Sequence, residues 1–233
     1  MTYNELATLL KPDISLDEEQ IKRLEKFQNL VIEKNKLFNL TSITENDSFL
    51  IKHLFDSLYP FRKLSLNGLN VLDFGSGGGF PGIPLAILFK DAQFTLLDAT
   101  EKKCAFLKYV SEELELDNVE VIHARGEELS SLNEHFDFIS ARAVSSLPIL
   151  LEMIAPLLKI NGEFLSLKGA NGIEELNVSH KAMRILSLSL INIEEYDLPL
   201  NLGKRTTFLF KKEKATNKKY PRAYAAIIQK PVI

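Results

Sequence analysis

The sequence predicts an α/β protein with a mostly parallel sheet of seven strands. From residue 69 onward, short apolar runs alternate with stretches of helical periodicity, the pattern of crossover units in a parallel sheet. After residue 188, two strand-like segments follow each other with only a turn between them, which indicates that an antiparallel hairpin closes the sheet. The 233 residues, 45% of them hydrophobic, suffice for one full core and a substantial extension.

A helical extension is expected to precede the sheet. Ser15 and Glu18 have the spacing of a capping box, and apolar residues recur after them at helical intervals. A second amphipathic stretch, Asp47–Phe61, should be helical until Pro60 ends it. Residues 1–67 are therefore assigned to a helical extension packed against the sheet domain.

The sheet domain is assigned to residues 68–213, and residues 214–233 to a basic tail. Apolar runs of strand length, the last two forming the hairpin, are Leu69–Phe74, Phe94–Asp98, Val119–His123, Phe136–Ala141, Gly162–Leu167, Leu188–Tyr196 and Thr206–Lys211. The helices expected between them are Ile83–Phe89, Glu101–Leu116, Leu147–Leu158 and Ile173–Leu186.

The most informative segment is a glycine-rich turn after the first strand of the sheet. An apolar run ends at Asp73, and five glycines follow between positions 75 and 82. Glycine adopts positive φ without steric cost and lets backbone amides approach a ligand closely. The helix after the turn should offer unpaired N–H groups to an anionic group. The segment therefore predicts a cofactor-binding turn.

Two cofactor classes fit this turn, and Asp73 separates them. Gly77, Gly79 and Gly82 satisfy the dinucleotide fingerprint, and Asp98 follows Gly77 by 21 residues, about where such folds place a ribose-binding acid. A carboxylate at position 73 would repel a pyrophosphate but attract the ammonium and sulfonium of S-adenosylmethionine (SAM). We expect SAM, with a nicotinamide dinucleotide and a turn without ligand as the alternatives.

The composition excludes several other kinds of site. Cys104 is the single cysteine, so neither an internal disulfide nor a cysteine-based zinc site can form. The four histidines lack the spacing of a helical metal site, and no metal is expected. No apolar stretch reaches the roughly 18 residues of a membrane span, and no signal-peptide pattern is present. We expect a cytoplasmic monomer without a membrane partner.

The net charge of −3 hides a strong asymmetry along the chain. Nine basic residues and one acid between positions 203 and 233 give this stretch a charge of +8. A basic strip on an acidic protein is typical of a local phosphate-binding surface, which favours a nucleic-acid partner. The alternative is a solvated tail that only aids solubility.

Several short motifs occur together in one order along the chain. These are Asn39-Leu40-Thr41, His53-Leu54-Phe55-Asp56-Ser57, Leu72 to Pro84, Thr95-Leu96-Leu97-Asp98, Ser140-Ala141-Arg142-Ala143, Lys168-Gly169 and Tyr220-Pro221-Arg222. In this order the chain resembles the small-subunit ribosomal RNA methyltransferase G family over nearly its full length. The resemblance implies a Rossmann-like SAM-dependent methyltransferase fold, to which the five alternating strands closed by a hairpin also point.

The resemblance further implies methyl transfer from SAM to N7 of a guanine in a conserved loop of 16S ribosomal RNA, the 530 loop. The substrate would be this RNA or a small-subunit ribosomal particle. Guanine N7 carries a lone pair and no proton, so its methylation needs positioning rather than a general base. A methyltransferase acting on a small molecule is the alternative function, because the same glycine turn would serve it.

The resemblance also implies a SAM pocket formed by Gly75, Phe80, Asp98, Gly126, Glu127 and Arg142, and the glycine turn adds Asp73 and Gly77 as expected cofactor-binding residues. Asp98 should accept hydrogen bonds from the ribose hydroxyls or, alternatively, cap a helix. Gly126 and Glu127 should meet the adenine edge, although Glu127 could equally be a surface acid. Arg142, which ends a strand beside the cleft, could hold the SAM carboxylate or an RNA phosphate, or form a plain ion pair.

Cations are also expected to recognise the RNA. Lys168 and Arg142 are the candidates for catalytic residues. Guanine N7 and O6 form an acceptor pair that a cation binds well, and Lys168 is the candidate to recognise it. A purely structural lysine at position 168 is the alternative. The residues expected to contact RNA are His53, Lys102, Lys103, Lys168 and Arg222. The chain departs from the resembled family most in the tail, at Ala223, Ala225 and Ile227.

Overall fold

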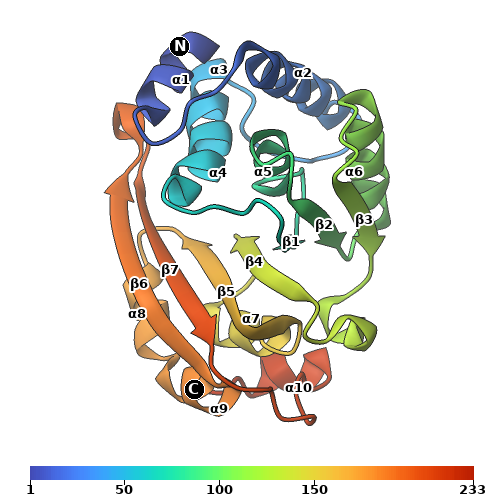
Figure 1. Ribbon diagram of the computed structural model, residues 1–233, viewed down its shortest axis with the longest axis vertical. Coiled ribbons are helices and arrows are strands. Elements are labelled where there is room, and N and C mark those ends of the chain that lie inside the picture. The colour runs from blue at the N-terminus through green and yellow to red at the C-terminus, as the bar shows by residue number, and fades with distance from the viewer.

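A seven-stranded sheet crosses the molecule, and helices cover both of its faces (Figure 1). The computed structural model describes residues 1–233. The strands are β1 (Asn70–Phe74), β2 (Gln93–Asp98), β3 (Val119–His123), β4 (Phe136–Arg142), β5 (Leu158–Lys168), β6 (Leu188–Asp197) and β7 (Lys204–Lys212). Their order in the sheet is β3-β2-β1-β4-β5-β7-β6.

The strand pairing confirms the predicted fold class. β1 pairs in parallel with β2 and β4, while β7 runs antiparallel to both β5 and β6. The chain winds from β1 toward β3 on one side and from β4 toward β6 on the other, so the switch point lies between β1 and β4. In open α/β sheets, ligands bind outside the carboxyl ends of the strands at such a point.

Side chains of one strand alternate between two separate cores. Val71 of β1 belongs to a core of 33 buried residues, whereas Leu72 and Phe74 belong to a second core of 23. A strand covered on both faces must be apolar at successive positions, which explains the continuous hydrophobic run in β1.

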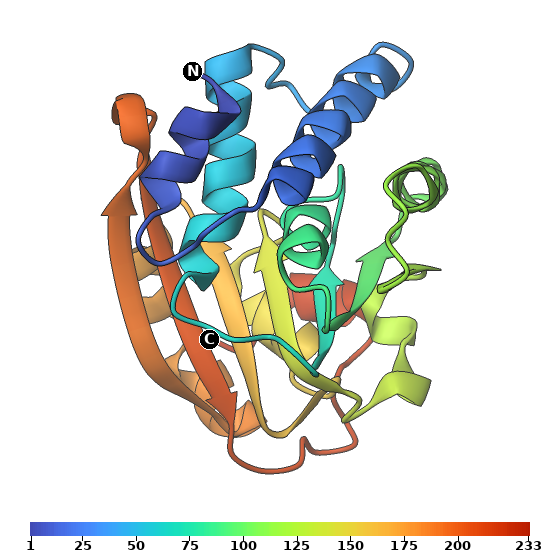
Figure 2. The same ribbon diagram turned by 45° about the horizontal axis from the view of Figure 1, so that its top comes forward.

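The first face of the sheet carries the helices from the first half of the chain (Figure 2). They are α1 (Tyr3–Leu10), α2 (Glu18–Asn35), α3 (Asn46–Phe49), η1 (Leu50–Phe55), α4 (Asp56–Leu58), η2 (Tyr59–Phe61), α5 (Gly82–Leu88) and α6 (Glu101–Glu113). The N-terminal extension shares the larger core with α5 and α6, so it forms part of this helical layer.

Two expectations for the extension need correction. The capping box of α2 joins Asp17 and Gln20 rather than Ser15 and Glu18: the Gln20 amide donates to the Asp17 carboxylate at 2.7 Å. The stretch Asp47–Phe61 is not one regular helix but four short segments, with the π-helical turn η1 in the middle. π-Helical turns are rare and occur frequently at functional sites.

The second face carries α7 (Leu147–Ile154), α8 (Gly172–Asn177), α9 (His180–Leu186) and α10 (Tyr224–Gln229), with the 3₁₀ turns η3 (Gly126–Glu128) and η4 (Ser130–Leu132) in connecting segments. A further 3₁₀ turn, η5 (Pro199–Asn201), connects β6 to β7. The expected helix Leu147–Leu158 ends early because β5 begins at Leu158, which pairs with β4. The expected helix Ile173–Leu186 is two helices, and Ser179 at the break donates to the Glu175 carbonyl at 2.7 Å.

The C-terminal segment folds back onto the second face, where α10 lies beside α7 (Figure 1). Ile227 of α10 is fully buried in the smaller core. Three of the nine basic residues after position 203 are held by the protein itself, because Arg205, Lys212 and Arg222 bind Asp56, Glu134 and Glu152. The basic strip expected to bind RNA is correspondingly smaller.

None of the helices has the length and apolarity needed to cross a membrane.

Candidate functional site

A pocket of about 270 Å³ opens at the carboxyl ends of β1, β2 and β3, next to the switch point of the sheet. The glycine turn and the end of β2 form one part of its wall, through Gly75, Asp98 and Ala99. Gly126 and Glu127 follow β3 and form another part. The sequence assigned four of these residues to a cofactor site, and the fold brings all four together.

The glycine turn is held tightly against β2. The amides of Gly75 and Ser76 both donate to the Leu97 carbonyl, at 2.9 and 2.8 Å. Gly75 has φ +78°, and a Cβ atom there would lie 2.6 Å from the Val144 side chain. Both the backbone conformation and the close approach therefore require glycine at position 75.

Asp73 lies beneath the turn and not in the pocket. Its side chain accepts a hydrogen bond from the Gly82 amide at 3.0 Å and from the Ser140 hydroxyl at 3.3 Å, and the residue is 1% exposed. Burial raises the pKa of its carboxyl to about 6, an effect that the hydrogen bonds from Ser76 and Gly82 oppose. The expected direct contact of Asp73 with the cofactor is thus corrected to a role in holding the turn.

The start of α5 offers no free amide to an anionic ligand, contrary to expectation. The Gly82 amide donates to Asp73, the amides of Ile83 and Leu85 donate to backbone carbonyls, and Pro84 has no N–H group. The positive end of this helix is therefore neutralised from within the protein, by Asp73.

Asp98 holds both the glycine turn and the segment before α6, and its binding of a ribose stays a prediction. One carboxylate oxygen accepts the Gly77 amide at 2.9 Å, and the other accepts the Thr100 amide at 2.8 Å, just before α6. The carboxylate lines the pocket, and each oxygen retains acceptor capacity beyond its one hydrogen bond. Lys103, expected to contact RNA, also lines this pocket, with its ammonium 3.9 Å from Asp98.

A second cavity, of about 670 Å³, adjoins the first. Both are lined by Ala143 and Val144, which follow β4. The charged and ionisable side chains around the second cavity are Lys52, His53, Asp56, Arg142, Lys168, Glu175 and Arg205. The cavity therefore carries more basic than acidic groups beside the cofactor pocket.

A buried carboxylate organises the cations of this second cavity. Asp56 is 3% exposed and accepts hydrogen bonds from Arg205 Nε at 2.9 and 3.0 Å and from the Tyr196 hydroxyl at 3.1 Å. Arg142 Nη1 lies 3.5 Å from the same carboxylate and donates to the Lys52 carbonyl at 3.3 Å. Sequence reasoning assigned no role to Asp56 or Arg205, although both fell within segments that it singled out.

His53 and Phe80 form a stacked pair, with ring centroids 4.2 Å apart and planes at 10°. Burial lowers the pKa of His53 to about 3, and nearby Arg142 acts in the same direction. His53 is thus neutral near pH 7, and its Nε2 lies 2.7 Å from the Thr41 hydroxyl. His53 lines the second cavity, and its contact with RNA, as a neutral ring, stays a prediction. Phe80, predicted to bind the cofactor, does not line the smaller pocket, and its ring centroid lies 5.3 Å from the Arg142 guanidinium carbon.

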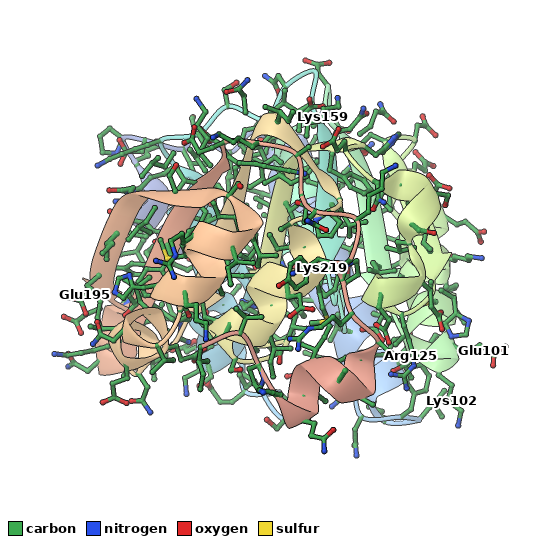
Figure 3. All side chains as sticks on the ribbon, turned by 90° about the horizontal axis from the view of Figure 1, so that it is seen from below. Glu101, Lys102, Arg125, Lys159, Glu195 and Lys219 are labelled. Carbon is green, nitrogen blue, oxygen red and sulfur yellow. The ribbon has the colours of Figure 1, made fainter.

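Lys168 reaches the second cavity but is strongly held there. Its ammonium donates to the Ser145 carbonyl at 2.6 Å and lies 2.8 Å from the Glu175 carboxylate. Lys102, by contrast, is exposed on α6 and lies next to Glu101 at the edge of the molecule (Figure 3). Of the cations predicted to contact RNA, Lys168 lies at the second cavity and Lys102 remains free at the surface.

Arg222, predicted to contact RNA, lies in neither cavity and is held within the protein. Its guanidinium binds the fully buried Glu152 of α7 in a bidentate pair, at 2.8 and 2.6 Å. The Arg222 amide donates to the same carboxylate at 3.0 Å. A buried carboxylate needs such partners, because desolvation without them is costly.

Comparison with known proteins decides the family. The family model described as rRNA small subunit methyltransferase G matches residues 20–202. The chain belongs to this family. The similar protein of this name from Lactococcus lactis is 39% identical over 238 residues and covers 100% of both chains. The relative from Carboxydothermus hydrogenoformans is 40% identical over 212 residues, with 90% of each chain covered.

Solved structures agree on the fold. A SAM-dependent methyltransferase from Aquifex aeolicus superposes with a TM-score of 0.57 at 18% identity, covering 71% of this chain and 93% of its own. TYW2 from M. jannaschii, solved with AdoMet, gives a TM-score of 0.51 at 16% identity, covering 85% and 77%. Family and fold together confirm SAM as the cofactor of this methyltransferase.

The residues of the smaller pocket fit this cofactor. Asp98 keeps acceptor capacity for two hydroxyl groups, as a ribose requires. At Gly126 a Cβ atom would lie 2.3 Å from the Phe74 ring, so a residue without a side chain keeps the wall after β3 in place. Leu97 and Met153 add apolar surface to the pocket, which suits an adenine ring.

Proposed function

We propose that this methyltransferase transfers the methyl group of SAM to N7 of a guanine in the 530 loop of 16S ribosomal RNA. The observation that carries the proposal is the basic cavity that adjoins the cofactor pocket across Ala143 and Val144. The names of the relatives support an RNA substrate of the small ribosomal subunit, either free or in a particle.

The chemistry of the second cavity favours an acceptor that carries no proton. Asp56 is engaged by Arg205 and Tyr196, and Glu175 by Lys168. His53 contacts the Thr41 hydroxyl and has a pKa of about 3, so it is a weak base. A carbon or oxygen acceptor would usually need a general base, whereas guanine N7 needs only alignment with the methyl group.

Arg142 is the group best suited to hold the guanine. Its Nη1 is engaged with Lys52 and Asp56, while its Nε and Nη2 make no hydrogen bond within the protein. Two N–H donors of a guanidinium match the N7 and O6 acceptors of guanine or the oxygens of a phosphate. Asp56 fixes the orientation of Arg142 beside the cofactor pocket. SAM, when bound, supplies the activated methyl group.

The test is methyl transfer from radiolabelled SAM to purified 16S RNA, small-subunit particles, transfer RNA and small metabolites. We expect label in the small-subunit RNA alone, and 7-methylguanosine mapped to the 530 loop. Arg142→Ala should lose transfer while it keeps SAM binding and a cooperative melting transition. Lys22→Ala, which removes an exposed cation of α2 outside both cavities, is the matched control and should retain activity. Labelling of a metabolite without labelling of RNA would refute the proposal.

A further inference from the structure

We propose that the C-terminal segment forms a wall of the SAM pocket and that Tyr224 binds the adenine end of the cofactor. This inference rests on the assignment of the smaller pocket to SAM, and it assigns the tail a role other than RNA binding. Tyr224 begins α10 and lines the pocket together with Asp98 and Glu127. It is 126 positions from Asp98 along the chain, and only the folded tail brings it there.

The position of Tyr224 indicates which end of the cofactor it meets. Its ring centroid lies 5.6 Å from the Arg125 guanidinium carbon, and Arg125 directly precedes Gly126 and Glu127 in the segment after β3. Figure 3 shows the labelled Arg125 next to the ribbon of α10. The Arg125 guanidinium lies over one face of the ring, and Tyr224 lines the pocket. With the ribose at Asp98, the base would extend toward this segment and meet the Tyr224 ring.

The tail is fixed in place well enough to serve as a wall. Arg222, two residues before Tyr224, is held by the buried Glu152 through three hydrogen bonds. Ile227, on the next turn of α10, is fully buried in the smaller core. These two anchors flank Tyr224, so its ring is positioned before any cofactor arrives, which lowers the entropic cost of binding.

The chemistry of adenine matches this wall. An aromatic side chain can stack on adenine, as on any other nucleobase, because every base has a π-face. The Tyr224 hydroxyl is not required for stacking, so phenylalanine should replace tyrosine without loss. From the strength of base–aromatic stacking, removal of the ring should weaken SAM binding by about 5- to 150-fold.

The experiment is calorimetric titration of SAM and of its demethylated product into the full chain, without RNA. We expect Tyr224→Ala to bind both ligands about 5- to 150-fold more weakly and Tyr224→Phe to bind like the wild type. Ile228→Ala, at a position 50% exposed on the same helix, is the matched control and should also bind like the wild type. Thermal melting without ligand confirms that each variant is folded.

A spectroscopic readout separates stacking from a structural effect. The chain has six tyrosines and no tryptophan, so tyrosine dominates its emission. SAM should quench part of this emission in the wild type, and Tyr224→Phe should lose that part while it keeps the affinity. Unchanged affinity in Tyr224→Ala, with weakened binding in Asp98→Ala, would overturn the inference alone. Unchanged affinity in both variants would overturn the assignment of the pocket as well.

Discussion

Arg222→Ala tests how the C-terminal segment is held. The substitution removes the guanidinium from Glu152, a carboxylate with 0% exposure, and breaks the bonds at 2.8 and 2.6 Å. Removing one partner of a buried ion pair typically costs about 3–5 kcal/mol, because the other charge stays buried and unpaired. The Arg222 side chain is 29% exposed, so water screens part of the interaction, and we expect a loss of about 2–3 kcal/mol.

Thermal melting converts this loss into a measurable shift. For a chain of this size each kcal/mol corresponds to about 2–4 °C, so Arg222→Ala should lower the melting temperature by about 4–12 °C. Lys219→Ala removes an exposed cation from the same tail and should change the stability by no more than about 0.5 kcal/mol.

A second pair of variants isolates the unpaired charge as the cause. Glu152→Leu combined with Arg222→Leu removes both charges, and we expect the double variant to recover much of the stability that Arg222→Leu alone loses. Equal melting temperatures for Arg222→Ala and Lys219→Ala would refute the reasoning. So would a double variant whose loss equals the sum of the two single losses, because the charges would then be independent.

Three further predictions follow from the buried groups around the site. The pKa of Asp73 is raised to about 6, so its ionisation lowers the free energy of unfolding by on the order of 3 kcal/mol as the pH rises from about 4 to about 6. Asp73→Asn should flatten this part of the plot of unfolding free energy against pH, measured by denaturant titration at several pH values. An unchanged slope in the variant would contradict the raised pKa of Asp73. Asp56→Asn should reduce single-turnover methyl transfer at least about tenfold with unchanged SAM affinity, since it loosens Arg142 and Arg205, and calorimetry checks the affinity. Gly126→Ala should lower the free energy of unfolding by about 1–3 kcal/mol, because the added methyl group overlaps the Phe74 ring. Adding Phe74→Leu to the same chain should recover part of this free energy in urea unfolding. Such a recovery would not occur if the loss had another cause.

Local patterns in the sequence were sufficient for much of the fold. The run Val119–His123 was predicted as a strand with the bounds that the structure has, because the residues between the two flanking turns are sufficient to indicate a strand. The structure of the stretch Asp47–Phe61 was not predicted correctly, because hydrophobic periodicity does not distinguish one α-helix from an α-helix interrupted by a π-helical turn.

In the candidate site, too, the sequence predicted the residues that are close along the chain but not the pairs that are far apart. Gly75 and Asp98, both predicted to bind the cofactor, line one pocket, because a strand, a tight turn and the end of the next strand must be adjacent in a crossover unit. Gly77 does not line the pocket, and its amide donates to Asp98. The partners of Asp56 and Glu152 were not predicted, because Arg205 is 149 positions from Asp56 and Arg222 is 70 positions from Glu152. Periodicity indicates which face of an element is buried but not which distant charge meets it there.

Local sequence patterns predicted the parallel sheet with its closing hairpin and the glycine turn, because each depends on residues that are close along the chain. The resemblance predicted the family and its cofactor from short motifs in a fixed order. The tertiary structure decided which charges are available. It paired Arg222 with Glu152, buried a neutral His53 against Phe80, and brought Tyr224 to the cofactor pocket. A buried charge without a partner is costly in free energy. A basic residue that the sequence predicts to contact RNA at the surface therefore forms an ion pair within the protein when a buried carboxylate lies beside it.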